Sequence, residues 1–373
     1  MILTLCFVNG FQDAISKKIF GFWGHIRIQP YTLNKSLIAE DELAQTNDTI
    51  LSQLKRFPQI VSINSYLTKS AVIEKNGEIE GSLLKGIDSL FPRKQLDNFI
   101  IKGSSIKFED SLYDKSLVIS ELLANKLQLS LNDTVKLHFI QTSTGSSTYR
   151  KLYVTGIYKT GLEEYDQLFC LVDIRLLQRI ISTDIAYVSG YEVFTSSPQE
   201  SNELSLAINE SISSEWLARS MESIFPNIFD WLEIQNVNRN VVFIIMGIVA
   251  LINLLTCLLV LVLERTRMVG ILKALGGEDR FIQQIFLYYA SFIALRGVGV
   301  GAIIGLLICW LQLLTGFIQL DETAYYVSVA PVVIVGWQIA LVVLATFLVA
   351  FLSLWLPTFL IRKIQPIQAI QFN

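Results

Sequence analysis

Three acidic side chains fall within four residues of the run GLEEYDQ, which occupies residues 161–167. Carboxylates this close together could hold a cation or serve as an acid–base pair. No second cluster converges on this run in the sequence, so we expect a solvated turn. The only histidines are His25 and His138. A histidine-based metal site is therefore not expected, and His138 falls on the polar face of an expected strand.

Neither the cysteines nor the short motifs of the chain indicate an enzyme. Three of the four cysteines lie in apolar runs, which leaves Cys170 without a partner for an internal disulfide. The sequence has no G-x-S-x-G, no H-E-x-x-H and no G-x-x-x-x-G-K-[ST] phosphate loop. We expect no cofactor on this chain, and any ATP would be hydrolysed by another chain. A net charge of −3 without a basic block argues against nucleic acid as a partner.

The apolar residues are concentrated after Val241 and in the first eight residues of a 373-residue chain that is 52% hydrophobic. Residues 241–263, 297–320 and 332–361 each reach the length of about 20 apolar residues that a spanning helix needs. The N-terminal run MILTLCFV would rise only about 12 Å as a helix. We interpret it as the end of a first transmembrane helix whose beginning is missing from this chain; a protein with three helices is the alternative.

These features divide the chain into eight expected segments. The segments are the end of a first transmembrane helix with its exit (1–22), a folded domain (23–234), a transmembrane helix (235–263), a coupling segment (264–280), a second transmembrane helix (281–320), a short loop (321–331), a third transmembrane helix (332–361) and a tail (362–373).

The basic residues of the short loops predict the orientation, because Lys and Arg stay on the cytoplasmic side. The segment 264–280 carries Arg265, Arg267, Lys273 and Arg280, and the tail carries basic residues at 362 and 363. The loop 321–331 has two acidic residues and no basic one. We therefore expect segment 264–280 and the C-terminus in the cytoplasm, and the large domain outside.

The outside domain has the patterns of mixed α and β structure. HIRIQPY is typical of a strand that ends at Pro30, and the alternation in TVKLHFI and KLYVTGIY predicts a hairpin over 134–158. A short helix is expected to pack Leu122, Leu123 and Leu127. A second helix is expected from apolar residues that recur every fourth position, at Leu204, Ile208, Ile212 and Trp216.

The segment LERTRMVGILKALGGEDR, residues 263–280, is a basic, amphipathic interruption between two apolar runs. An apolar stripe on a short helix is formed by Met268, Ile271, Leu272 and Leu275, while Arg265, Arg267 and Lys273 project elsewhere. Gly276 and Gly277 supply a helix stop. The stripe fits either a groove in a partner protein or the lipid headgroups of the membrane surface.

Gly297, Gly301 and Gly305 recur every fourth residue and predict a helix-packing face in the membrane, with simple tolerance of glycine as the alternative. Arg296 just precedes them. It would be a deep, functional residue if the span begins near Phe281, and an anchor on the cytoplasmic side if the span is 297–320, which we favour.

The coupling segment resembles that of the FtsX-like permease family. The resemblance rests on Glu264, Arg265, Met268, Val269, Gly270, Ile271, Leu272, Lys273, Ala274, Leu275 and Gly276. The runs VNGFQDAISKKIFGFWGHIRI, VTGIYKTGLEEYDQLFCLVDIRLLQRI and RKIQPIQAI, together with SLVISELLANKLQLSLNDTVKL, resemble the lipoprotein-releasing permeases of that family. In the last of these runs Asn132 replaces the usual glycine.

The resemblance implies an α-helical membrane protein with three full transmembrane helices plus a partial N-terminal one. Its large α+β periplasmic domain would combine a porter-like part with an inserted subdomain near 112–175. Such a chain is a mechanotransmission-type ABC transporter subunit in the bacterial inner membrane. It pairs with a second permease, identical or not, and with an ATPase that holds ATP and Mg²⁺. The ATPase would contact segment 264–280, including Arg267.

Lipoprotein release from the inner membrane is the function we expect, with a lipoprotein or another periplasmic protein as substrate. The same machinery could instead serve peptide or drug efflux, or control cell-wall hydrolases in cell division. A membrane receptor unrelated to ABC transporters, with segment 264–280 merely interfacial, is the least favoured alternative.

Overall fold

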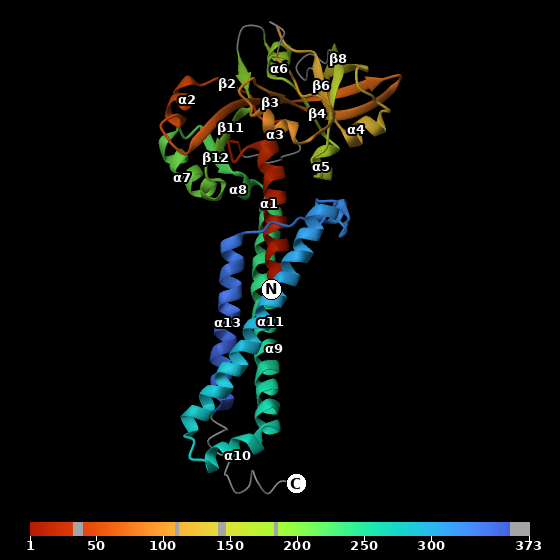
Figure 1. The fold of residues 1–373 in the computed structure, drawn as a ribbon. Helices are drawn as coiled ribbons and strands as arrows, with labels where there is room; N and C mark the ends of the chain where they lie inside the picture. The colour runs from red at the N-terminus through yellow and green to blue at the C-terminus, as the bar shows by residue number, and fades with distance from the viewer. Residues whose placement is uncertain (33–39, 109–111, 141–146, 183–185, 359–373) are drawn as a thin grey trace. The chain divides into compact units, whose positions relative to one another are not determined.

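The computed structural model describes residues 1–32, 40–108, 112–140, 147–182 and 186–358, and the chain forms two compact units (Figure 1). The α+β unit contains Ile15–Phe229 and the separate segment Asp321–Ser328. The helical unit contains Met1–Ala14, Asp230–Leu320 and the residues from Val329 onward. The segment Asp321–Ser328 therefore belongs to a different unit from the residues on both sides of it.

A ten-stranded mixed sheet is the framework of the α+β unit, with the strand order β12-β1-β11-β3-β4-β9-β6-β8-β5 and with β7 pairing both β3 and β8. β2 and β10 pair separately. The strands are β1 (Ile26–Pro30), β2 (Ala44–Gln45), β3 (Ile60–Lys75), β4 (Glu78–Ile87), β5 (Ile100–Gly103), β6 (Ser116–Ser120), β7 (Thr134–Ile140), β8 (Ser147–Tyr158), β9 (Phe169–Asp173), β10 (Tyr187–Val188), β11 (Gly190–Thr195) and β12 (Trp216–Ser220).

The α+β unit also contains short helices. They are α2 (Asp48–Leu54), α3 (Arg93–Asp97), α4 (Glu121–Lys126), α5 (Glu163–Asp166), α6 (Ile174–Ile181), α7 (Ser201–Ser211), α8 (Met221–Ile224), α12 (Glu322–Tyr325) and the 3₁₀ turn η1 (Pro198–Glu200).

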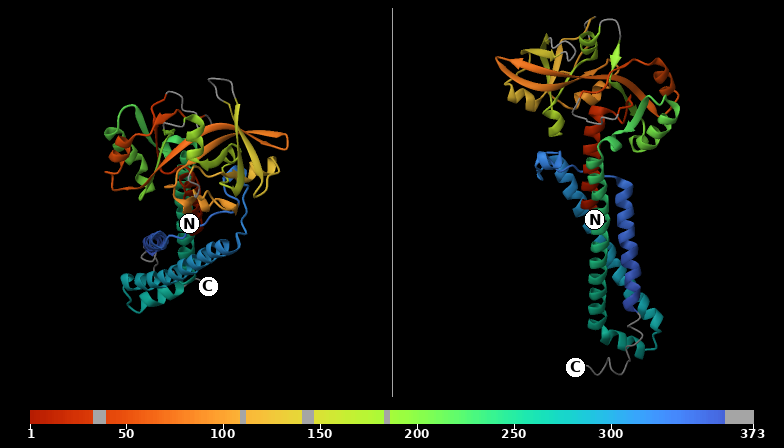
Figure 2. Two further views of the ribbon diagram at one scale, coloured as in Figure 1. Left: turned by 90° about the horizontal axis from the view of Figure 1, so that it is seen from above. Right: turned by 180° about the vertical axis from the view of Figure 1, so that it is seen from behind.

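The longest pairing in the sheet is the β3–β4 hairpin, which is drawn in orange and visible from above and from behind in Figure 2. Asn76 and Gly77 turn the chain there with φ of 52° and 89°. An Asn-Gly pair with two positive φ angles matches the right-handed twist of the flanking strands. This hairpin places Lys85 in the middle of the sheet, where it becomes important below.

Several predictions for this unit are confirmed. The expected strand ending at Pro30 is β1, and the hairpin over 134–158 is β7 paired with β8, with Val135, Leu137 and Phe139 buried. Asn132 adopts a φ of 67°. Asparagine tolerates this left-handed conformation better than most residues, so glycine is not needed at this position.

Other expectations were wrong in detail. The helix expected to pack Leu122, Leu123 and Leu127 is α4, and Leu123 and Leu127 are buried as predicted, but Leu122 is 41% exposed. The helix predicted through Trp216 ends at Ser211, and Trp216 begins β12, so the fourfold recurrence continued past the helix end by chance. The inserted subdomain expected near 112–175 stays a prediction, and its strands β6 to β9 pair within the ten-stranded sheet.

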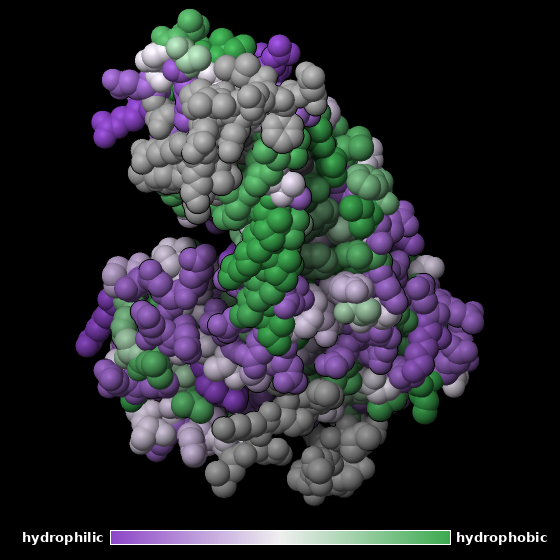
Figure 3. Space-filling view, turned by 90° about the horizontal axis from the view of Figure 1, so that it is seen from below, coloured by the Kyte–Doolittle hydropathy of each residue, from purple (hydrophilic) through white to green (hydrophobic). Residues whose placement is uncertain are grey.

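The helical unit consists of long helices and one short one. They are α1 (Ile2–Trp23, of which the last nine residues belong to the α+β unit), α9 (Pro226–Glu264, beginning in the α+β unit), α10 (Thr266–Ala274), α11 (Asp279–Thr315) and α13 (Gly336–Thr358). α11 packs along α13. The apolar side chains on these helices form the green surface in Figure 3.

The helices Pro226–Cys257 and Arg280–Thr315, which overlap the predicted spans 235–263 and 281–320, are long and apolar enough to cross a membrane. The third is represented in the described residues by the shorter apolar helix Gly336–Leu352. The predicted helix end at Leu320 is five residues too late, because Gly316 takes a left-handed φ of 57° and closes α11 at Thr315. The predicted helix start at residue 235 is too late as well, since α9 begins at Pro226.

Candidate functional site

The short helix α10 has the stop that its two glycines predicted. The amides of Gly276 and Gly277 donate to the carbonyls of Lys273 and Leu272 at 3.0 and 2.9 Å, and Gly276 has a φ of 89°. Glu264 ends α9 and Arg265 caps α10. The whole segment from Glu264 to Asp279 thus forms one helical elbow between α9 and α11.

The apolar residues of α10 lie on two sides of that helix. Leu272 packs against the cluster of Val269, Ile282 and Phe286, which holds α10 to the start of α11. Leu275 is 81% exposed. Met268 and Ile271 are exposed as well, and Gly270 is buried. Three of the four stripe residues are thus available to a partner, and Leu272 is not.

The glycine row of α11 is divided in the same way. A Cβ added at Gly305 would lie 3.5 Å from the Cβ of Ile2, so this glycine packs against α1, whereas Gly297 and Gly301 have nothing within 4 Å. Gly301 and Gly305 line an apolar pocket of 320 Å³ between α1, α11 and α13. The guanidinium of Arg296 stacks on Phe292 at 4.2 Å.

The end of α1 is fixed in the α+β unit by a buried charge. The Lys85 ammonium donates to the carbonyl of Phe22 in the last turn of α1 and pairs with Glu192 at 2.7 Å. It also lies 4.3 Å from the centre of the Trp23 ring. A cation at a helix C-terminus interacts favourably with the unpaired carbonyls there. Burial lowers the pKa of Lys85 to about 8, although Glu192 opposes that shift.

Two buried residues that follow α1, His25 and Arg27, make further contacts with the sheet. Arg27 of β1 donates to the hydroxyl of Tyr66 at 2.6 Å and forms an ion pair with Asp41. The Nδ1 atom of His25 accepts the amide of Thr195 at 2.8 Å, so the ring carries its proton on Nε2. Burial lowers the pKa of His25 to about 4. We call Phe22, Trp23, His25, Arg27, Lys85 and Glu192 the α1 anchor.

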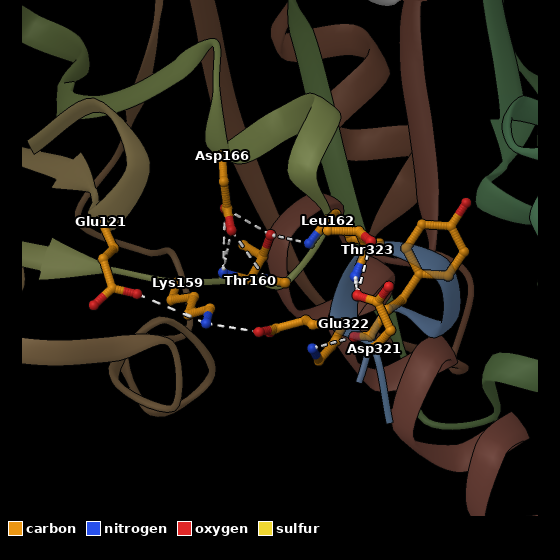
Figure 4. Close-up of polar contacts among 11 residues, drawn as sticks. Glu121, Lys159, Thr160, Leu162, Asp166, Asp321, Glu322 and Thr323 are labelled. Atoms are coloured by element: carbon orange, nitrogen blue, oxygen red, sulfur yellow. Dashed lines mark hydrogen bonds and ion pairs between the residues drawn. The ribbon is translucent and has the colours of Figure 1, made fainter. Parts of the chain in front are cut away.

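The acidic run at 161–167 is not the solvated turn that the sequence suggested. Asp166 is buried, and it accepts hydrogen bonds from the amides of Thr160 and Gly161 and from the Thr160 hydroxyl at 2.7 Å. Burial raises the pKa of Asp166, and these hydrogen bonds oppose the shift. Figure 4 shows this carboxylate bonded to the turn that precedes α5. The described residues contain no cluster suited to a metal ion.

The same turn binds the segment Asp321–Ser328, which we call the clasp. Lys159 forms an ion pair with Glu322 of α12 at 2.7 Å and lies 3.7 Å from Glu121 (Figure 4). The ammonium of Lys18, on α1, donates to the carbonyl of Tyr326 at 2.6 Å. The hydrogen bond with Glu322 raises the pKa of Lys159.

Sequence reasoning missed both the α1 anchor and the clasp. Lys85 lies in the run GSLLKGI, where a lysine between apolar residues was a signal for a buried, paired charge. The clasp left no comparable signal, because Lys18, Lys159 and Glu322 are far apart in the sequence and each is an ordinary surface residue type.

Comparisons with known proteins find one matching family model and several similar membrane proteins. Residues 240–366 match the family model described as FtsX-like permease C-terminal. The chain is 20% identical over 386 residues to the lipoprotein-releasing system transmembrane protein LolE of Haemophilus influenzae, covering 99% of this chain and 90% of that protein. It is 23% identical over 397 residues to LolC of Neisseria meningitidis serogroup B, covering 100% and 91%.

Among solved structures, the extracellular domain of the transporter YknZ from Gram-positive bacteria aligns with 52% of this chain and 98% of that domain, at 18% identity and a TM-score of 0.36.

Residues 240–366, which include the coupling segment, thus match the FtsX-like permease family that this segment was predicted to resemble. Along nearly its whole length the chain is similar to the LolC and LolE transmembrane proteins of lipoprotein-releasing systems.

Proposed function

We propose that this chain is the permease subunit of an ABC transporter that releases lipoproteins from the bacterial inner membrane. One observation carries the proposal: relatives that match 99% and 100% of the chain are transmembrane proteins of lipoprotein-releasing systems. The chain itself is not a catalytic enzyme. ATP and Mg²⁺ bind to a separate ATPase, and a second permease completes the complex.

In this proposal α10 lies in the cytoplasm and is the contact with the ATPase. Its exposed residues Met268, Ile271 and Leu275 have the size and spacing to enter a groove of a partner. The basic residues Arg265, Arg267 and Lys273 surround them and suit the acidic rim of such a groove. The acidic clasp, on the other side of the membrane, agrees with this orientation.

The α+β unit lies in the periplasm and receives the motion through α1 and α9. β1 begins three residues after α1 ends, and β12 precedes the start of α9 by six residues. β1 and β12 are paired neighbours along five residues. Motion of either helix therefore reaches the same edge of the sheet, and the α1 anchor makes one of the two connections rigid.

The test is complementation of a host strain depleted of this chain. We compare the wild-type chain with Leu275→Asp and with Leu206→Asp, which makes the same change at an exposed leucine of α7. A charge in a docking groove typically costs more than about 2 kcal/mol. We expect Leu275→Asp to reduce the ATPase that copurifies in mild detergent at least about tenfold and to leave lipoproteins in the inner membrane.

Leu206→Asp should behave as the wild type in both measurements. An unchanged distribution of lipoproteins after depletion would overturn the substrate. Copurification of a hydrolase or an outer-membrane channel would then favour the alternative tasks of cell-wall control or efflux. If no ATPase copurifies even with the wild-type chain, the protein is not an ABC subunit.

A further inference from the structure

The clasp connects the two units by a route that the chain order does not require. Asp321–Ser328 is joined to the helical unit at both of its ends, through residues 320 and 329, yet it packs in the α+β unit. The α+β unit is otherwise connected at only two places, within α1 and within α9. When the clasp is in place, the loop between α11 and α13 is therefore a third connection.

The binding surface for the clasp has a specific shape. Gly161 has a φ of 77°, and a Cβ added there would lie close to Lys18 Nζ, 2.7 Å from Glu322 Oε1 and 3.1 Å from the Tyr326 carbonyl. Asp166 holds the amide of Gly161 at 3.0 Å and so fixes the turn. Glycine at position 161 thus leaves room for the ends of Lys18 and Glu322 and for the Tyr326 carbonyl.

The ion pair of this contact is exposed to water, while the Lys18 bond to the Tyr326 carbonyl is partly buried. Lys159 is 39% exposed and Glu322 is 27% exposed, and ion pairs in contact with water contribute little. Within Asp321–Ser328, every residue of which is described, Val327 is the one buried side chain. Tyr326 adopts a left-handed φ of 60°, which is unfavourable for a bulky residue and opposes the closed form.

From the close steric fit at Gly161 and the exposed ion pair between Lys159 and Glu322 we propose that the clasp is detachable. Its ion pair with Lys159 opens and closes while the α+β unit stays folded. The loop between α11 and α13 contacts the α+β unit only in the closed form. That the ATPase cycle drives this opening rests on the proposed function.

Zero-length carbodiimide crosslinking of the full chain in detergent tests the proposal without altering any residue. The reagent joins a lysine amine to a carboxylate in direct contact, so the closed clasp gives a peptide with Lys159 linked to Glu322. The link from Lys159 to Glu121 is an internal reference, because both residues lie within Ile15–Phe229. The ratio of the two links, read by mass spectrometry, measures how much clasp is closed.

We expect the ratio to fall at least about threefold when salt rises from about 0.05 to 0.5 M, since salt screens exposed pairs. The thermal midpoint of the α+β unit should move by less than about 2 °C. A ratio that does not change with salt means a permanent contact, and absence of the Lys159–Glu322 link at low salt means no contact. A clasp that opens only together with the whole unit is not detachable. Each of these three results overturns the proposal.

A pair of variants separates the steric effect of a side chain at position 161 from the effect of backbone strain. Gly161→Ala should lower the crosslink ratio at low salt at least about threefold, because the methyl group would crowd the ends of Lys18 and Glu322 and the Tyr326 carbonyl. Gly77→Ala is the control, since Gly77 also has a positive φ, 89°, but has nothing within 4 Å. Equal crosslink ratios in the two variants would contradict a steric role for Gly161 in binding the clasp.

The last measurement uses the complex with its ATPase. Trapping the ATPase with ATP and vanadate should lower the ratio at least about threefold relative to the nucleotide-free complex. If the crosslink ratio does not change during ATP hydrolysis, the clasp does not open in the ATPase cycle. Failure of any ATPase to bind instead contradicts the proposed function, while the salt result still decides whether the clasp detaches.

Discussion

Two lysines of the α+β unit make the same kind of contact in opposite surroundings. Lys85 pairs with Glu192 where the side chains are 1% and 0% exposed, and it fixes the end of α1. Lys159 pairs with Glu322 at the same distance, 2.7 Å, but both side chains are partly in water. The same distance between nitrogen and oxygen therefore occurs in two ion pairs that differ in how firmly they hold their segments. The buried pair cannot be left half-formed, whereas water can replace either partner of the exposed pair.

The magnitudes support this distinction. Removing one partner from a buried pair typically costs about 3 to 5 kcal/mol, because the other charge stays buried without compensation. An exposed pair is typically worth about 0 to 1 kcal/mol. The left-handed residue in the clasp costs on the order of 1 kcal/mol. The α1 anchor is thus a permanent joint, while the clasp is close to balanced between closed and open.

The largest effect is expected at the buried pair. Lys85→Met removes the ammonium from Glu192 and from the Phe22 carbonyl, and it should destabilise the unit by about 3 to 5 kcal/mol. For a unit of this size that lowers the thermal midpoint by about 10 °C. Tryptophan fluorescence of the purified chain during heating measures the midpoint, and Trp23 lies in the anchor itself.

Lys159→Met is the matched control and should move the midpoint by less than about 2 °C. The double variant Lys85→Met with Glu192→Leu should recover much of the loss, because no unpaired charge remains. Similar shifts of the thermal midpoint for Lys85→Met and Lys159→Met would contradict the claim that the buried pair stabilises the unit more than the exposed pair.

A smaller, pH-dependent effect is expected from His25 in the α1 anchor. Its pKa is about 4 in the folded protein and 6.5 in its ordinary state, so the unfolded chain takes up the proton first. The contribution of the neutral ring is therefore complete above about pH 6.5 and is lost as the pH falls toward 4. At pH 5 the loss is about 2 kcal/mol, or a midpoint lower by about 5 °C.

The variant His25→Asn isolates this contribution, because an amide oxygen can accept the Thr195 amide but does not titrate in this range. The midpoint of the wild type should fall more steeply than that of the variant between pH 7 and pH 4.5. Parallel curves for the two proteins would show that His25 is not the titrating group.

The sequence predicted the elements that follow a local period and missed those that depend on distant pairing. The hairpin over 134–158 and the glycine stop after α10 were correct because alternation and glycine chemistry act over a few residues. The end of α11 was missed at Gly316, since a glycine inside an apolar run is tolerated in a membrane helix and gives no clear stop.

For the candidate sites the limit was of the same kind. The elbow was found because its motif is contiguous, from Glu264 to Gly276, although its inward residue Leu272 could not be told from the exposed Leu275 by spacing alone. The clasp combines α1, the end of β8 and the loop after α11. Only the folded chain brings those three together.

The smallest effect on stability, and the most direct on the clasp, is expected from Glu322→Lys. The new charge faces Lys159 and opens the clasp, so α12 is left as an isolated turn of four residues. Such a short helix does not persist alone. The amides of Tyr325 and Tyr326, which donate to the carbonyls of Asp321 and Glu322 in the wild type, should exchange hydrogen at least about fivefold faster.

Exchange over Asp321–Ser328, followed by mass spectrometry, should increase while the core strand β9 is unaffected. Glu164→Lys makes the same charge change at an exposed residue of the neighbouring α5 and should leave the clasp protected. Adding Lys159→Glu to Glu322→Lys restores an opposite pair. The rescue should be partial, because the new carboxylate lies beside Glu121, which is 3.7 Å from the Lys159 ammonium in the wild type. If the double variant exchanges as fast as the single one, the ion pair does not hold the clasp, and Val327 and the Lys18 bond to the Tyr326 carbonyl hold it instead.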